Sequence, residues 1–161
     1  MRPLIREARP GDVPQLVTMI HSLADHLGLA GECRVSEEQL GSQLFGDAPM
    51  LFALIVERAG QVAGMATWYV TYSTWDAAHG IHVEDLYVEP RHRRQGIGVA
   101  VLTHLARVCV ERGYTRLEAS AVDWNTPASL FAQHGANRMD EWAAYRLTGE
   151  PLRVFAARES V

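Results

Sequence analysis

A turn that holds two glycines and three arginines is the part of the sequence best suited to ligand chemistry. It reads Val88-Glu89-Pro90-Arg91-His92-Arg93-Arg94-Gln95-Gly96-Ile97-Gly98. Glycine lets the backbone approach a ligand, and the first turn of a following helix leaves N–H groups unpaired at the positive end of the helix dipole. Arginine adds charge that pairs with phosphate. The turn therefore predicts a pyrophosphate site, and a solvated basic loop is the alternative.

The residues after the glycines exclude two familiar phosphate loops. A Walker A loop needs Gly-Lys-Ser/Thr after its glycines, and the dinucleotide fingerprint needs a third glycine. Ala100 and Val101 offer neither.

Two adjacent carboxylates, Glu84 and Asp85, precede the turn. Carboxylates on a strand beside a ligand site can bind a cation or act as general acids and bases. Strand alternation predicts that the two carboxylates point to opposite faces, so we expect different roles for them. Surface carboxylates on a strand are the alternative. The histidines show no recognised metal-ligand spacing, and no metal is predicted.

These residues need a scaffold in which strands and helices interleave. Hydrophobic spacing and turn residues predict strands at 3–8, 51–58, 61–71, 81–88, 115–122, 137–141 and 142–147. They predict helices from a cap at Asp12 to Gly28, from Ser36 to Phe45, from 97 to 113, and from Thr126-Pro127 to Gly135. The turn thus lies between a strand and a helix. An early hairpin in this alternation predicts an α/β fold with a mixed sheet and helices on its faces. We expect one domain over residues 1–161.

Composition and charge limit the partners. Fifteen Lys plus Arg against nineteen Asp plus Glu give a net charge of -4, so no basic excess predicts a nucleic-acid surface. Cys33 and Cys109 form no paired motif. The first ten residues lack an apolar signal core, and no segment approaches the ~20 apolar residues that span a bilayer. We expect a cytoplasmic protein with no membrane partner.

The pattern Arg93-x-x-Gly96-x-Gly98, after the strand Val83-Glu84-Asp85-Leu86-Tyr87-Val88, resembles the acyl-CoA-binding motif of the GNAT N-acetyltransferase superfamily. Further segments resemble its diamine and polyamine branch, namely Ile5-Arg6-Glu7-Ala8, Tyr72-Ser73-Thr74-Trp75, Asp123-Trp124-Asn125-Thr126-Pro127-Ala128 and Tyr145-Arg146-Leu147. The resemblance implies a mostly antiparallel central sheet, splayed at its central strands, with helices on both faces.

The resemblance also implies acetyl-CoA as the co-substrate. In the family, the strand before the turn pairs with the pantetheine arm and the turn amides hold the pyrophosphate. The cofactor-binding residues implied are Leu86, Tyr87, Val88, Arg93, Arg94, Gln95, Gly96, Ile97, Gly98, Val99 and Asn125. For Asn125, an ordinary turn asparagine is the alternative. A backbone N–H near Tyr87 or Val88 is expected to stabilise the thioester oxygen, and the sequence leaves open which one.

For the acceptor, the resemblance implies that Glu84 binds a cationic amine and accepts its proton through water. Asp85 is a second substrate-binding candidate, and Trp75 is expected to border the acceptor channel. The tyrosine that serves as general acid in the family is replaced here by Ala132. Tyr145, Tyr87, His134 or water are possible substitutes, and we assign none.

We therefore expect an N-acetyltransferase that moves acetyl from acetyl-CoA to the primary amine of a polyamine or diamine by direct attack. An amino acid, an aminoglycoside or a protein amine is the alternative acceptor. A catalytically weak acyl-CoA-binding or sensing module is the alternative function, because Ala132 has no proton to donate. The resemblance also leads us to expect a homodimer.

Overall fold

The computed structural model of the protein describes residues 2–122 and 127–157. The chain divides into two compact units, residues 1–130 and residues 131–161, which we describe separately. The first unit holds the sheet and the helices around it. The single domain over residues 1–161 stays a prediction.

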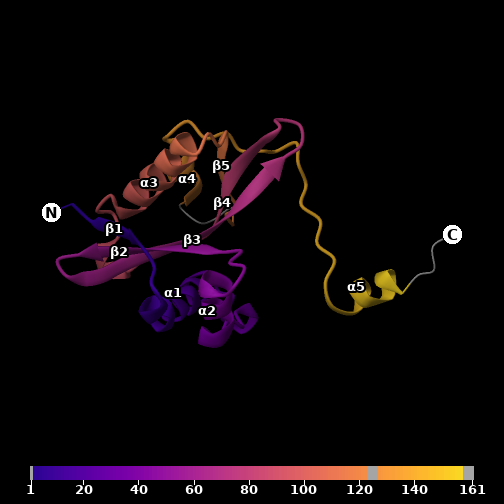
Figure 1. The fold of residues 1–161 in the computed structure, drawn as a ribbon, viewed down its shortest axis with the longest axis horizontal. Coiled ribbons are helices and arrows are strands. Elements are labelled where there is room, and N and C mark those ends of the chain that lie inside the picture. Colours follow the sequence, from indigo (N-terminus) through magenta and orange to yellow (C-terminus); the bar gives the residue numbers. More distant parts are fainter. Residues whose placement is uncertain (1, 123–126, 158–161) are drawn as a thin grey trace. The chain divides into compact units, whose positions relative to one another are not determined.

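Five strands form one sheet in chain order within the described residues, and the first four are antiparallel (Figure 1). They are β1 (Leu4–Glu7), β2 (Phe52–Arg58), β3 (Gln61–Ser73), β4 (Ala78–Val88) and β5 (Arg116–Ala119). The last strand pairs with β4 in parallel. The predicted mixed, mostly antiparallel sheet is confirmed.

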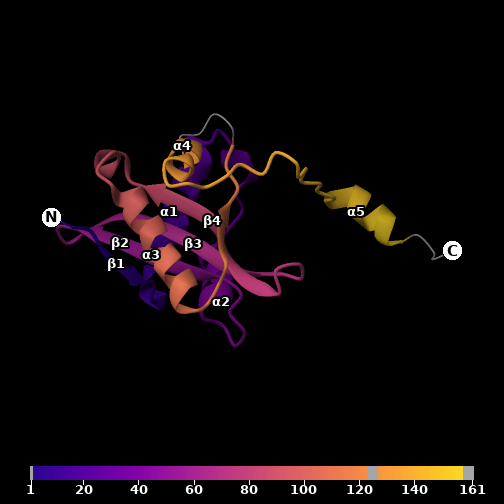
Figure 2. The same cartoon turned by 90° about the horizontal axis from the view of Figure 1, so that it is seen from above.

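Helices cover both faces of this sheet, which explains why β2 and β3 are apolar on both sides (Figure 2). Helices α1 (Val13–His26) and α2 (Glu37–Phe45) lie on one face, and α3 (Ile97–Glu111) lies on the other. Helix α4 (Pro127–Ala132) follows β5, and the boundary between the two units falls within it, after Leu130. The first unit also contains three short 3-10 turns at Pro10–Asp12, Ala30–Glu32 and Pro90–His92. The predicted helices on both faces are therefore confirmed.

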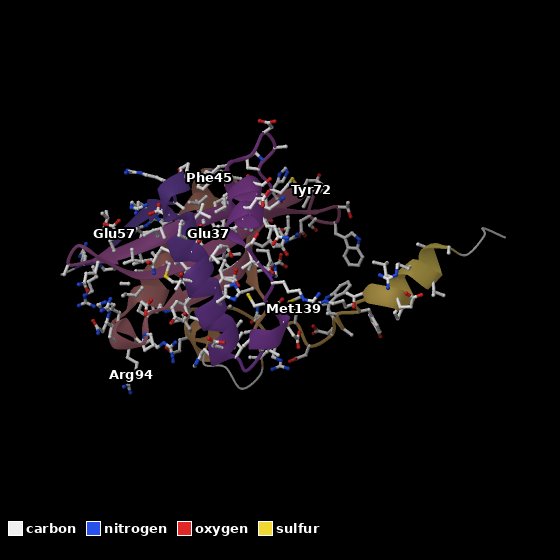
Figure 3. The ribbon with its side chains drawn as sticks, turned by 90° about the horizontal axis from the view of Figure 1, so that it is seen from below. Glu37, Phe45, Glu57, Tyr72, Arg94 and Met139 are labelled. Atoms are coloured by element: carbon white, nitrogen blue, oxygen red, sulfur yellow. The ribbon has the colours of Figure 1, made fainter. Side chains whose placement is uncertain are left out.

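Two cores hold these layers together. On the first face, α1 and α2 pack against the sheet through a cluster that contains Val13, Leu16, Met19, Leu40, Leu44, Ala53, Ile55, Met65 and Tyr87. On the other face, α3 buries Ile97, Val101, Leu102, Leu105 and Cys109. Helix α2 begins at a capping box in which Gln39 N–H donates to Ser36 Oγ and Ser36 N–H donates to Gln39 Oε1, as its sequence predicts. Glu37 and Phe45 mark its two ends in Figure 3.

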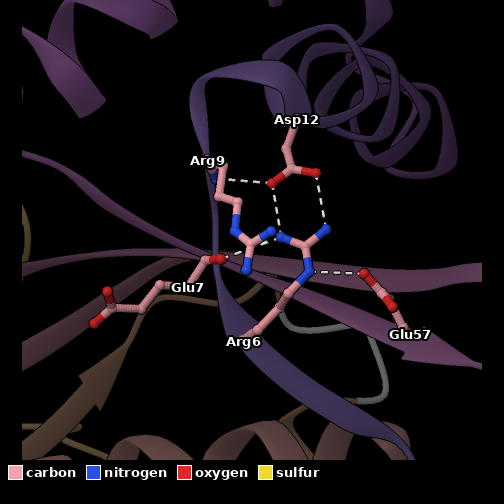
Figure 4. A network of polar contacts seen from close by, with 5 residues as sticks. All are labelled: Arg6, Glu7, Arg9, Asp12 and Glu57. Atoms are coloured by element: carbon pink, nitrogen blue, oxygen red, sulfur yellow. Dashed lines mark hydrogen bonds and ion pairs between the residues drawn. The ribbon is translucent and has the colours of Figure 1, made fainter.

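An arginine network fixes β1 to its surroundings (Figure 4). Arg6 donates from Nη1 and Nη2 to the two carboxylate oxygens of Asp12 at 2.7 and 2.9 Å, and from Nε to Glu57 Oε1 at 2.7 Å. Asp12 is the N-cap residue of α1, as the sequence predicts, but its carboxylate does not cap the helix and accepts the Arg9 N–H and the Arg6 guanidinium instead. The Arg6 bonds lower the pKa of Asp12 below its usual value.

The end of the chain corrects the sequence prediction. The strands expected at 137–141 and 142–147 are wrong: the structure has no strand in either segment, only a turn at 140–141. A helix that was not predicted, α5 (Gly149–Ala156), follows instead. A strand requires a ladder partner, and neither segment has one among the described residues.

Candidate active site

The edge of β4 is open on the side of β5 over its last five residues. Residues Gly80–Val83 pair with Arg116–Ala119, and the two strands then separate. This is the splay that the resemblance implied. On the other side, β3 continues to pair with β4 as far as Val88. Among the described residues, no strand lies beside residues 84–88 of β4 on the side of β5. We call the space left there the gap.

The direction of the backbone groups along this open edge follows from one hydrogen bond. Glu89 N–H donates to Ala63 O at 3.0 Å, so Tyr87, two residues earlier, also points its N–H and C=O toward β3. Leu86 and Val88 therefore point their N–H groups into the gap. The side chain of Tyr87 is buried in the core that faces α1. The sequence predicts Leu86, Tyr87 and Val88 along the pantetheine arm. Of these three residues, only Leu86 and Val88 point their N–H groups into the gap.

A β-bulge places Glu84 at the start of the open edge. Asp85 pairs with Thr67 and Val83 pairs with Trp68, so Glu84 has no opposite residue on β3. Thr67 and Trp68 are consecutive and point to opposite faces, and their partners Asp85 and Val83 must do the same. The prediction for the two carboxylates assumed regular alternation, and that assumption is wrong here.

Asp85 is half-buried beside Thr67, which is fully buried. The Thr67 hydroxyl donates to Asp85 Oδ2 at 2.6 Å. Burial raises the pKa of Asp85, the Thr67 bond opposes that rise, and the negative charge of Glu84 adds to it. Burial also raises the pKa of Tyr69, which lies on the same face as Thr67, with the charges of Glu84 and Glu118 as further causes. Negative charge thus gathers around the bulge, which suits a cationic ligand.

Arg93 anchors the turn at residues 88–98, which the sequence predicts to bind pyrophosphate and which we call the phosphate turn, to β4. Its Nε donates to Val88 O at 2.9 Å, and its guanidinium lies 5.7 Å from the centre of the Tyr87 ring. The neighbouring Arg94 has a positive φ of 57° and an exposed side chain that points outward in Figure 3. The sequence predicted both arginines as cofactor ligands, whereas the structure gives Arg93 an internal partner and leaves Arg94 at the surface.

The first turn of α3 presents unpaired amides next to these arginines. Gly96, with φ 79°, is the N-cap residue, and no side chain of the described chain caps the helix. Ala100 N–H donates back to Gly96 O, so the N–H groups of Ile97, Gly98 and Val99 precede the first intrahelical bond. The helix is 15 residues long, and its dipole favours an anion at this end.

Gly98 has a second role that the sequence did not reveal. A Cβ at this position would lie 3.2 Å from Leu130 Cδ2, so the missing side chain lets α4 approach α3. The side chain of Ile97 is buried, and this residue can therefore offer a ligand its backbone only.

Arg58, at the end of β2, reaches the turn across 37 positions of sequence. Its Nη1 donates to Gln95 Oε1, and Gln95 Nε2 donates to Arg91 O at 3.0 Å. Sequence reasoning missed Arg58, because only the register of β2, β3 and β4 brings it to the turn.

The remaining predicted residues lie elsewhere. Trp75 is 85% exposed in the connection between β3 and β4. Asn125 lies outside the described residues. Ala132, His134 and Tyr145 belong to the second unit, where Tyr145 is exposed.

Residues 2–122 and 127–157 contain no group of three or more His, Cys, Asp or Glu side chains placed to hold a metal ion. In the same part of the chain, every helix is too short or too polar to cross a membrane.

Sequence comparison relates the whole chain to acetyltransferases. The profile of the Acetyltransferase (GNAT) family matches residues 20–136. A thialysine N-epsilon-acetyltransferase from Bos taurus is 33% identical over 167 residues, which cover 96% of this chain and 98% of that protein. The human spermidine/spermine N(1)-acetyltransferase-like protein 1 is 26% identical over 166 residues, which cover 96% of this chain and 24% of that protein.

Solved structures share the fold. An integron cassette protein from the mobile metagenome of V. cholerae superposes with a TM-score of 0.80 at 23% identity, over 98% of this chain and 99% of that one. A predicted acetyltransferase from Clostridium acetobutylicum, crystallised with acetyl-CoA, superposes with a TM-score of 0.72 at 21% identity, over 91% of this chain and 97% of that one.

Proposed function

This chain belongs to the acetyltransferase (GNAT) family and is an N-acetyltransferase, and on that premise we propose that its acceptor is the primary amine of a small polyamine or diamine. The observation that carries this proposal is the open edge of β4, which runs from the carboxylates Glu84 and Asp85 to the phosphate turn. It gives a thioester donor and a cationic acceptor one place to meet.

Acetyl-CoA fits the donors that the first unit presents. The N–H groups of Ile97, Gly98 and Val99 suit the pyrophosphate, with Arg94 and Arg91 as exposed positive charges nearby. The N–H groups of Leu86 and Val88 suit the amides of the pantetheine arm, which adds alongside β4 as an extended chain. These residues hold the co-substrate, and the co-substrate brings the activated acetyl group.

Leu86 is the donor that we propose for the thioester oxygen. A strand rises about 3.3 Å per residue, so Leu86 lies roughly 7 Å along β4 from Glu84, whereas Val88 lies roughly 13 Å away. The reacting carbonyl must be close to the group that receives the proton of the amine, and Leu86 satisfies this condition better. Tyr87, the other candidate from sequence, points its N–H toward β3.

Glu84 is the proposed base. It is exposed at the bulge, and it accepts the proton of the bound ammonium group through water. The neutral amine then attacks the thioester carbonyl, the C–S bond breaks, and coenzyme A leaves as a thiolate that takes up the remaining proton of the attacking nitrogen through water. Asp85 and Trp75 complete the proposed acceptor site, with Asp85 adding negative potential. The name of one relative supports this class of acceptor, since it refers to spermidine and spermine. The name of the other refers to thialysine, an amino acid that carries a primary amine on its side chain.

The test is a thiol-release assay with acetyl-CoA and a panel of acceptors that contains spermidine, a diamine, lysine, an aminoglycoside and a protein. We expect the highest kcat/KM with the polyamine or the diamine. Glu84→Gln should lower kcat about 100-fold or more, in the range of general-base losses. Glu111→Gln, which removes an exposed carboxylate from α3, is the matched control and should keep full activity. A clear preference for lysine, the aminoglycoside or the protein would overturn the proposed acceptor class.

We also propose a cytoplasmic homodimer. Cys33 and Cys109 are free thiols, as expected in a reducing compartment. The second unit exposes large apolar side chains, among them Trp142, Tyr145 and Phe155, and α5 buries none of its residues. Exposed apolar surface of this kind favours association with a second copy.

A further inference from the structure

The hairpin of β2 and β3 supports the phosphate turn at two points. At the start of the turn, Glu89 N–H donates to Ala63 O at 3.0 Å. Ala63 is the extra residue of a bulge, because Val56 pairs with Gly64 and Glu57 pairs with Val62. At the end of the turn, Arg58 of β2 donates to Gln95. The turn is therefore held by a neighbouring hairpin as well as by its own strand and helix.

Gln95 is fixed at both ends of its amide group. Its Oε1 accepts from Arg58 Nη1, and its Nε2 donates to Arg91 O within the turn. Gln95 directly precedes Gly96, the N-cap of α3. Because both polar atoms of Gln95 have partners in the protein, its side chain links Arg58 of β2 to the backbone of Arg91 and restricts the conformation of the turn.

We propose that Arg58 is a positioning residue for acetyl-CoA: through Gln95 it presets the orientation of the first-turn amides of α3 before the pyrophosphate binds. This inference rests on the proposed acetyl-CoA site. A turn that is ordered in advance does not lose conformational freedom when the ligand binds, and the ligand binds more tightly for that reason. The bond is charge-assisted but exposed, so we expect its loss to weaken acetyl-CoA binding about three- to tenfold.

Arg58 could instead contact the 3′-phosphate of coenzyme A directly, and the two roles have different consequences. A residue that presets the amides acts on the pyrophosphate, which acetyl-CoA and acetyl-dephospho-CoA share. A residue that binds the 3′-phosphate acts on acetyl-CoA alone. Comparison of the two co-substrates therefore separates positioning from direct contact.

The experiment measures KM and kcat for both co-substrates, and Kd for coenzyme A by calorimetry, in the wild type and in five variants of the full chain. Arg58→Met should raise KM for both co-substrates by the same factor and leave kcat unchanged. Gln95→Ala should show the same change, and the double variant should be no worse than either single variant. Arg58→Lys should restore part of the affinity. Arg107→Met, which removes one exposed positive charge from the outer face of α3, is the control and should bind like the wild type.

Three results would overturn the role of Arg58. They are an unchanged KM in Arg58→Met, additive effects in the double variant, and a loss confined to acetyl-CoA. Thermal unfolding of each variant checks that the fold is intact, and an unchanged kcat confirms it independently. If the wild-type protein itself fails to bind coenzyme A, the proposed co-substrate site fails, whereas wild-type binding with an unaffected Arg58→Met variant refutes the positioning role alone.

Discussion

Asp85 shows how a single residue can be held in an environment that its type does not favour. Burial raises its pKa, and the bond from the Thr67 hydroxyl offsets only part of that rise. An aspartate kept in such a place opposes folding when it is ionised, and groups of this kind gather at functional sites. The sequence identified Asp85 as a candidate, but its burial and its partner come from the packing of β3 against β4.

Asp85→Asn tests the cost of this charge. Because the folded pKa is raised, the folded protein binds the proton more tightly than the unfolded chain, and ionised Asp85 lowers the free energy of unfolding at neutral pH. We expect the variant to be more stable than the wild type at pH 7 by on the order of 1 kcal/mol, with lower activity. The difference in free energy of unfolding between the variant and the wild type should become smaller as the pH falls from 7 toward the usual pKa of an aspartate. Urea unfolding at several pH values measures this difference. A constant difference across the pH range would contradict a raised pKa of Asp85 in the folded protein.

Arg93→Glu tests the anchor of the phosphate turn. The substitution removes the bond to Val88 O and the contact with the Tyr87 ring, and it adds a negative charge beside the proposed pyrophosphate site. We expect Kd for coenzyme A to rise about 100-fold, which corresponds to the loss of a charge-assisted bond plus repulsion. Calorimetry measures this change. An unchanged Kd would show that the turn is not the cofactor site.

Ala132→Tyr tests whether a proton donor is missing. Ala132 is exposed, so a tyrosine fits at this position. If protonation of the departing thiolate limits the rate, the variant should gain about tenfold in kcat with little change in KM. Steady-state kinetics with the preferred amine measure both constants. An unchanged kcat would mean that another group donates the proton or that another step limits turnover.

The elements that the sequence predicts most accurately are those whose conformation depends on residues adjacent in the chain. The capping box of α2 and the turn at Ala59-Gly60 both stand where their residue types predict them. The strands predicted at 137–147 do not form, because a strand depends on a partner that may come from any part of the chain. For the same reason, β5 spans only Arg116–Ala119 within the predicted 115–122.

The hairpin that supports the phosphate turn offers a prediction at this scale. Ala59 and Gly60 have φ values of 51° and 76°, the pattern of a two-residue hairpin turn in which asparagine is favoured at the first position. Ala59→Asn should therefore raise the free energy of unfolding by about 0.5–1 kcal/mol without loss of activity. Thermal and urea unfolding measure the gain. A destabilised variant would indicate that the turn has another conformation.

The whole molecule separates its charges in a way that the net value of -4 conceals. Arg58, Arg91, Arg93 and Arg94 meet at one end of the open edge of β4, and Glu84 and Asp85 lie at the other. This separation supports the proposal that a polyanionic donor and a cationic acceptor bind at opposite ends of one site. Arg58 lies near the other three arginines only because the register of β2, β3 and β4 places the end of β2 beside the turn.

The proposed homodimer is tested on the intact protein. Light scattering after size-exclusion chromatography should give twice the 17.9 kDa of one chain. The double variant Trp142→Ser with Phe155→Ser should shift the protein toward the monomer, since it removes exposed apolar surface from the second unit. Val110→Ser, at an exposed apolar residue of α3, serves as the control. A monomeric wild type at micromolar concentration would contradict the proposal.

The sequence by itself determined the class of fold and the family, because both follow from local patterns or from motifs that resemble those of known acetyltransferases. The phosphate turn stays a prediction from the same motifs. Tertiary structure decided the rest. The bulge at Glu84, the burial of Asp85, the N–H groups that face the gap and the bond from Arg58 to Gln95 all depend on how β2, β3, β4 and β5 are aligned. A shift of one residue in that alignment would reverse the direction of the side chains and exchange the backbone groups that face the gap, and no local pattern in the sequence encodes it.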